Sequence, residues 1–384
     1  VLYLSEILYI LSLVSTACST NTVQNKTEPK SAEEELLRMD EENLGYPSVY
    51  TVSSRGRGYL MMSFIFDTLT WKDEKGVIPL LAEKWEVTPD QKTWTFHLVK
   101  NAKFTDGKPL TAEDVKFSFD YIKQHPHPWV YLNMINETKV VDDYTVQISL
   151  SQVYAPFITD VAGNVPIMPK HLWQNVKEPE KFDTPEAVIG SGPFTLTSYD
   201  KTAGTYIYKA NQDYFYGKPV VDKLVFSPNQ NPKEALEKGE LDVAQKTKYG
   251  EAMQLQKEGK FKVIEGPGLW VGRMYFNFGV PEFNQRELRQ ALYYAINRQE
   301  LVAKASKNSS IAGNPGHIYP DSEWYFKDVK QYEFSPEKAK QLLDAVGMKD
   351  VNQDGIRDYN GKPMEYEFLV TDDRVNEAEM IKNQ

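Results

Sequence analysis

Two histidines on one short loop are the first residues whose spacing could support chemistry. His125 and His127 stand one residue apart and are flanked by Pro126 and Pro128. Two imidazoles on a rigid loop can ligate a metal ion or a metal chelate. The loop contains no cysteine and no third histidine to complete such a site. The sequence therefore favours a loop that holds no metal.

An acidic run near the C-terminal end is the second candidate for a metal site. The segment 350–358, DVNQDGIRD, resembles the start of a calcium-binding loop. The twelfth position of that loop would be Gly361, where a bidentate glutamate is needed. A hairpin turn rich in Gly, Asp and Asn is the better interpretation. We therefore expect neither a bound metal nor a cofactor.

Motifs typical of catalysis are missing from the sequence. It contains no nucleophile-elbow serine, no His-Glu-x-x-His and no phosphate-binding glycine loop of the Walker type. Gly190-Ser191-Gly192 is followed by Pro193, which has no N–H to donate to a phosphate. Acidic residues are plentiful, but sequence alone does not pair two of them across a cleft. We expect a protein that is not an enzyme, with an extracellular hydrolase as a remote alternative.

The composition excludes some partners. The 54 acidic residues outnumber the 44 basic ones, so the formal net charge is −10. This balance argues against binding to nucleic acid and against a basic membrane-surface patch. Aromatic residues make up 12% of the chain, which fits either packing in a core or an aromatic-lined cleft.

Cys18 is the only cysteine, which excludes an internal disulfide. It follows an apolar run, Leu4–Val14, that is too short to span a bilayer comfortably, and then three small residues. This pattern is typical of a lipoprotein signal that ends in a lipid-modified cysteine. Ser15 stands where leucine is usual, no basic residue precedes the run, and the chain begins with valine. We expect 1–18 to be an incomplete signal peptide and 19–35 a flexible tether.

Strand and helix patterns alternate along the remaining chain, which predicts an α/β or α+β class. Alternation of apolar and polar residues, or a run of β-prone residues, predicts strands at 85–87, 93–98, both arms of 139–150, 194–198, 205–209, 223–226, 269–278 and 366–370. Apolar runs, caps and helical spacing predict helices at 61–69, after Thr111, at 233–238, after Asn284, at 335–347 and from 372 onward. Val115, Phe119 and Ile122 recur on one helical face and would meet a core.

A series of short motifs resembles the extracellular solute-binding protein family 5, the dipeptide-, oligopeptide- and nickel-binding receptors of ABC importers. The most specific motif is FTDGKPLTAEDVKFS at 104–118. Further motifs follow the order of the family: LAEKW at 81–85, WTFHL at 94–98, IMPKH at 167–171, GSGPF at 190–194, GELD at 239–242, YFN at 275–277 and FNQRELRQALYYAINR at 283–298. The resemblance covers nearly all of the chain from about Gly45 onward.

This resemblance implies an α/β fold of the two-lobe periplasmic-binding-protein type, class II-like, with an extra inserted subdomain. Lobe I would comprise 36–268, with the inserted subdomain at about 60–168. Lobe II would comprise 269–384. Family chains continue further before they complete the second lobe and cross back to the first. We therefore expect lobe II to be truncated and part of the binding cleft to be absent.

The resemblance also implies three places for ligand contacts, the first being the loop after the first strand, about Ser48–Tyr59. Arg55 and Arg57 would meet a ligand carboxylate there through forked N–H donors, and Tyr59 would lie beside them. Two solvated loop arginines are the competing interpretation.

The second place is the loop that contains His125, and the third is the strand that crosses between lobes. Trp129 or Tyr131 would form an aromatic wall on this loop, or would pack against the subdomain instead. Trp270 and Arg273 would lie near the hinge, and Trp270 as a core residue is the competing interpretation.

The function that the resemblance implies is capture of a peptide or a similar small polar solute for an ABC permease. The receptor would be a lipid-anchored monomer at the outer face of the membrane and would close by hinge motion. A nickel or metal-chelate receptor of the same fold is the first alternative. A hydrolase and a non-functional fragment are the others.

Overall fold

A computed structural model describes residues 34–52, 56–73, 75–128, 130–245, 247–264, 266, 271–306, 309–313, 315–318, 322, 325–371 and 374–384. The expected signal peptide and most of the tether lie outside these ranges. The chain forms two compact units that divide between Thr247 and Lys248, here called unit 1 and unit 2. Across the ranges given above, no helix combines the length and the apolar character that a bilayer span requires.

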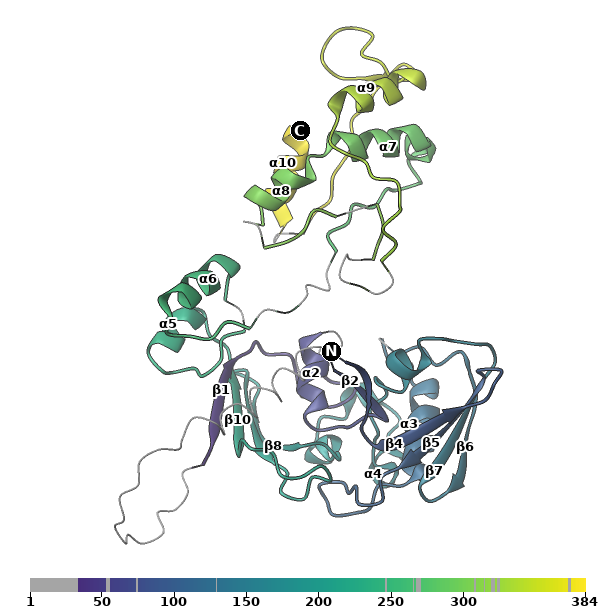
Figure 1. Cartoon of the computed structure of the whole chain (residues 1–384), viewed down its shortest axis with the longest axis vertical. Coiled ribbons are helices and arrows are strands. Elements are labelled where there is room, and N and C mark those ends of the chain that lie inside the picture. The colour runs from purple at the N-terminus through teal and green to yellow at the C-terminus, as the bar shows by residue number, and fades with distance from the viewer. Residues whose placement is uncertain are drawn as a thin grey trace. The chain divides into compact units, whose positions relative to one another are not determined.

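Unit 1 contains a four-stranded sheet in which the first strand of the unit pairs with its last (Figure 1). The strand order is β1 (Leu36–Asp40), β10 (Lys223–Ser227), β9 (Thr205–Ala210) and β8 (Phe194–Asp200). The β1–β10 pair is parallel, and the other pairs are antiparallel. Tyr206 and Tyr208 of β9 and Leu224 and Phe226 of β10 are fully buried, as expected for residues two apart on one face. The predicted strands at 194–198, 205–209 and 223–226 are confirmed.

A second, wholly antiparallel sheet lies within the chain between β1 and β8. Its order is β4 (Ala82–Val87), β5 (Thr93–Leu98), β7 (Thr145–Leu150) and β6 (Ile135–Asp142). Helix α3 (Ala112–Gln124) packs against β6 and β7, and its N-terminus has the expected capping box of Thr111 and Asp114. Val115, Phe119 and Ile122 are buried to within 1% exposure, so the predicted core face is confirmed. The hairpin of β2 (Thr70–Asp73) and β3 (Gly76–Pro79) precedes this sheet.

The helix predicted at 61–69 is wrong in its extent. Helix α2 is Arg57–Ser63, and the chain then leaves the helix. The carbonyl of Phe64 accepts the N–H of Phe194 at 2.9 Å, and the carbonyl of Ile65 accepts that of Gly192 at 2.7 Å. A helix that continued through these residues would use both carbonyls internally. Pairing with a segment far along the chain therefore ends the helix.

Shorter elements complete unit 1. They are a π-helical turn η2 (Phe157–Val161), helix α4 (Lys170–Trp173), the 3-10 turns η3 (Pro179–Lys181) and η4 (Pro185–Val188), and helix α5 (Pro232–Glu237). Helix α5 ends before Gly239, whose φ of 71° is the left-handed conformation predicted for that position.

Unit 2 is mainly helical. Its elements are α6 (Tyr249–Glu258), η5 (Pro281–Asn284), α7 (Arg286–Ala295), α8 (Arg298–Lys304), α9 (Pro336–Ala345), β11 (Asp358–Tyr359), β12 (Lys362–Pro363) and α10 (Val375–Asn383). Helices α7 and α9 pack together. Helix α9 has its predicted Ser335 cap and first-turn proline, and Gly347 follows it with φ of 81°. The cap predicted at Asn284 is wrong by one residue, since Gln285 precedes α7.

Two strands predicted in unit 2 do not form. Residues 271–278 and 366–370 are described, and neither segment is a strand. Within the described part of unit 2, the strand pair is β11 with β12. A β-prone sequence becomes a strand only when a partner accepts its backbone hydrogen bonds, and sequence pattern does not supply the partner. The hairpin favoured for 350–358 is confirmed in form, because Lys349 and Asp358 bridge in antiparallel fashion around it.

Candidate functional site

The carboxyl end of strand β1 carries an ion pair between a buried carboxylate and a partly exposed arginine. Glu41 follows β1 directly, and its N–H donates to the carbonyl of Ser227 at the end of β10, at 2.9 Å. The Oε2 atom of Glu41 lies 2.9 Å from Nε of Arg57, the first residue of α2. The Glu41 side chain is 0% exposed and that of Arg57 is 32% exposed. Ligands of open α/β sheets bind beyond the carboxyl ends of parallel strands, which is where this pair lies.

Two loops predicted to meet ligand contact each other in unit 1. The hydroxyl of Tyr50 donates to the carbonyl of His125 at 2.7 Å. Nε2 of His127 donates to the carbonyl of Val49 at 2.8 Å, since a carbonyl can only accept. The rings of Tyr50 and His127 also meet edge to face, with centroids 5.3 Å apart. The loop after β1 is therefore fixed to the loop after α3.

His127 is a buried side chain that joins its loop to the loop after β1. The residue is 5% exposed, and burial lowers the pKa of its imidazole, although the hydrogen bond to Val49 acts in the opposite direction. Within the parts of the chain that the structure describes, no three His, Cys, Asp or Glu side chains are grouped to hold a metal ion. The contact requires a proton on Nε2, and the lowered pKa favours the neutral form of the ring.

Replacing His127 with alanine is expected to loosen the joined loops. The carbonyl of Val49 would lose its donor in a buried place, which costs about 1–3 kcal/mol of unfolding free energy. Urea unfolding of the purified chain measures this loss. The matched control is His125→Ala, because the contact at His125 uses its backbone carbonyl and survives the change. Equal loss in both variants would contradict the role given to the His127 ring.

The predicted site residues lie in different environments. Tyr59 is in the core of unit 1, and its hydroxyl donates to the carbonyl of Gly163 at 3.3 Å. Tyr131 is 72% exposed. Arg273 belongs to unit 2, where its Nη1 donates to the Tyr275 hydroxyl at 3.2 Å. The remaining predicted residues lie outside the described ranges: Cys18, Arg55, Trp129 and Trp270. Lipidation stays a prediction for Cys18, and ligand contact stays a prediction for the other residues.

A buried carboxylate that the sequence analysis missed lies where several segments of unit 1 meet. Asp67 is 3% exposed, and its carboxylate accepts hydrogen bonds from Ser191 Oγ at 2.8 Å and from the Tyr214 hydroxyl at 3.0 Å. Burial raises the pKa of this carboxyl to about 7, although both hydrogen bonds act to lower it. The sequence does contain a sign of this buried carboxylate, because Asp67 is the only acidic residue in the apolar run MSFIFDTL at 62–69.

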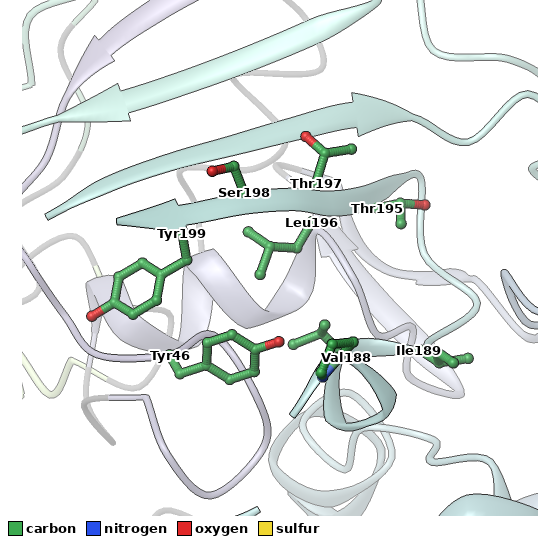
Figure 2. A pocket seen from close by; sticks show the side chains of 9 residues that line it. Tyr46, Val188, Ile189, Thr195, Leu196, Thr197, Ser198 and Tyr199 are labelled. Carbon is green, nitrogen blue, oxygen red and sulfur yellow. The ribbon is translucent and has the colours of Figure 1, made fainter. Parts of the chain in front are cut away.

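A surface pocket of about 200 Å³ lies beside edge strand β8 (Figure 2). Tyr46 and Tyr199 meet edge to face on one side of it, with centroids 5.8 Å apart, and the Tyr46 hydroxyl donates to the carbonyl of Thr184. The volume is below the roughly 300–1,000 Å³ of pockets that enclose a small molecule. The residues that line it are Tyr46, Pro185, Val188, Ile189, Thr195, Leu196, Thr197, Ser198 and Tyr199.

Comparison with known families decides the class of the protein. Residues 76–384 match the model of the bacterial extracellular solute-binding proteins, family 5. The chain belongs to this family. The resemblance that its motifs indicate is thereby confirmed, and so is the α/β fold of a periplasmic binding protein. Family 5 proteins act outside the cytoplasm, and the relatives found are solute-binding proteins rather than enzymes.

Relatives of family 5 show how far the likeness extends. The dipeptide-binding protein of Escherichia coli is 35% identical over 301 residues, which is 71% of this chain and 55% of that protein. The oligopeptide-binding protein AppA of Bacillus subtilis, solved with a nonapeptide, matches with a TM-score of 0.66 at 26% identity, over 85% of this chain and 67% of AppA. This chain therefore spans little more than half the length of the curated relative.

A third match supports the fold alone. NikZ of Campylobacter jejuni, solved with nickel and L-histidine, gives a TM-score of 0.74 at 24% identity. The match covers 91% of this chain and 71% of NikZ. Peptide receptors and nickel-chelate receptors thus share the architecture of this family 5 chain.

Proposed function

We propose that this chain belongs to the substrate-binding component of an ABC importer that captures a peptide or a similar small polar solute. The observation that carries the proposal is the family 5 match, together with relatives whose names specify dipeptides or oligopeptides. Capture would occur between two lobes, with hinge closure and delivery to a membrane permease. Binding without turnover is the expected mode, because no catalytic motif stands in the sequence.

The proposed lobes and anchor follow the sequence expectations. Lobe I is assigned to 36–268, with an inserted subdomain at about 60–168, and lobe II begins at 269. Lipid attachment at Cys18 would hold a monomer at the outer face of the membrane. Mass spectrometry of Cys18 from a membrane fraction tests the anchor, since a free thiol there would exclude it.

Calorimetric titration of the full chain with di- and tripeptides tests the function. Saturable binding of peptides supports it, and the second arm of the experiment uses nickel with L-histidine. The fold shared with NikZ makes a metal-chelate receptor the second candidate. Binding in the nickel arm alone would replace the peptide proposal. Hydrolysis of the peptides by the purified chain would overturn both candidates.

A further inference from the structure

Asp67 holds together segments of unit 1 that are far apart in the chain. Its backbone carbonyl accepts the N–H of Ile167 at 2.9 Å. Its side-chain oxygens accept hydrogen bonds from Ser191, just before β8, and from Tyr214, in the loop 211–217 between β9 and β10. Asp67 therefore ties the 211–217 loop to the stretch that leads from α2 to the second sheet.

The 211–217 loop has two further ties to the region of the second sheet, and both are open to water. Hydrogen bonds of 3.2 Å link the loop to Asn101 and to the carbonyl of Leu80, and each is exposed. Water replaces such bonds at little cost. The bond from Tyr214 is partly buried and ends on a carboxylate that is 3% exposed. We therefore expect the contact with Asp67 to decide whether the loop stays closed.

Few ionisable groups face Asp67. The stretches beside it, 64–70, 165–168 and 190–193, contain no other acidic or basic residue. Across the described residues, no basic side chain pairs with Asp67. The ionisable residues of the 211–217 loop are the exposed Asp213, Tyr214 and Tyr216. Burial raises the pKa of both phenols above its usual value, so they stay protonated in the neutral range. Asp67 is therefore the buried group of this cluster that can change its charge there.

We propose that Asp67, Ser191 and Tyr214 form a pH-sensitive clasp that holds the 211–217 loop closed and releases it when the carboxyl ionises. The protonated carboxyl fits the buried site, because either hydroxyl oxygen can accept a hydrogen bond from it. The ionised carboxyl gains hydration when the loop opens, which favours the open form. Family 5 proteins act outside the cytoplasm, so the clasp responds directly to the pH of the surroundings. This device does not depend on which solute is captured.

Hydrogen–deuterium exchange of the 211–217 amides in the full chain tests the clasp. Exchange is measured at pH 5.5, 7 and 8.5 and corrected for the intrinsic rate at each pH. The pKa of the Asp67 carboxyl is about 7 in the closed loop, against an ordinary 3.8. Opening should therefore be about thirtyfold more frequent at pH 8.5 than at pH 5.5, and it should level off above about pH 8. Asp67→Asn should abolish this change.

Ser191→Ala provides a second test that keeps both the carboxyl and its contact with Tyr214. The hydrogen bond from Ser191 lowers the pKa of the Asp67 carboxyl. Its loss should therefore move the levelling-off of loop opening to higher pH. A purely structural role for Asp67 would leave that point unmoved and would overturn the clasp.

The matched control is Asp213→Asn, because Asp213 lies in the same loop and is exposed. This variant should respond to pH as wild type does. Equal corrected protection of the 211–217 loop at all three pH values in wild type would overturn the proposal. So would an unchanged response in Asp67→Asn, since another group would then control the loop. An equal loss of protection in α3 would show unfolding of the whole unit rather than local opening, and would also overturn it.

Discussion

Alanine at Gly190 is expected to destabilise unit 1 severely. An added Cβ would lie 2.1 Å from the carbonyl oxygen of Ile65, far inside van der Waals contact, and the obstructing atom belongs to the backbone. The neighbouring pairing of Gly192 N–H with Ile65 would have to open to relieve the clash. We expect a loss of about 3 kcal/mol or more in unfolding free energy. Urea unfolding and the soluble yield measure it.

Gly250 provides the matched control for that substitution. It lies in α6, has an ordinary helical φ, and no heavy atom stands within 4 Å of the Cβ that alanine would add. Gly250→Ala should be neutral or stabilising by up to about 1 kcal/mol, because alanine favours helix. If Gly190→Ala unfolds at the same urea concentration as wild type, the close backbone packing of 64–65 against 190–194 is contradicted.

Replacing Asp67 with asparagine is expected to change how stability depends on pH. The pKa of this carboxyl rises from its ordinary value near 3.8 to about 7 in the folded protein. Between these values the folded chain retains a proton that the unfolded chain has lost. The contribution of Asp67 is therefore fully present below about pH 4 and disappears as pH rises through 7, a span of about 4 kcal/mol at most. Asp67→Asn removes this dependence.

Melting temperatures from pH 4.5 to 8.5 test the effect. Wild type should lose stability relative to Asp67→Asn as pH rises, and the variant should be the more stable protein at pH 8. The exposed Asp213→Asn serves as control, with a difference from wild type that stays nearly constant. A constant difference between wild type and Asp67→Asn would show that Asp67 titrates alike in both states.

Local sequence patterns were sufficient to predict many of the helices and strands. Strands β4 to β7 and helix α3 have neighbours close in the chain, so alternation and a capping box sufficed to predict them. Helix α9 was equally clear from its cap, proline and glycine. The predicted strands do not form over the described residues 271–278 and 366–370, because strand formation depends on a distant partner.

The candidate site was only partly visible in the sequence. Arg57 was predicted as a ligand contact, but its pairing with Glu41 was not predicted. Glu41 lies 16 positions earlier in a charged stretch, and no spacing rule indicates that the two side chains pair. The contact of His127 with Val49 spans 78 positions and was equally hidden. Asp67 had a usable signal, because an acid within an apolar run must be either paired or neutral when buried.

The parallel pair of β1 and β10 sets the order in which the chain can fold. Its partners, such as Leu36 and Lys223, stand 187 positions apart, while β4, β5, β6 and β7 pair within a single stretch of 82–150. A ribosome finishes the second sheet long before it makes β10. Closing so long a loop also carries an entropic cost that local hairpins avoid. Strand β1 therefore cannot pair with β10 until the ribosome has made β10. The hydrogen bond between Glu41 and Ser227 forms only after that point.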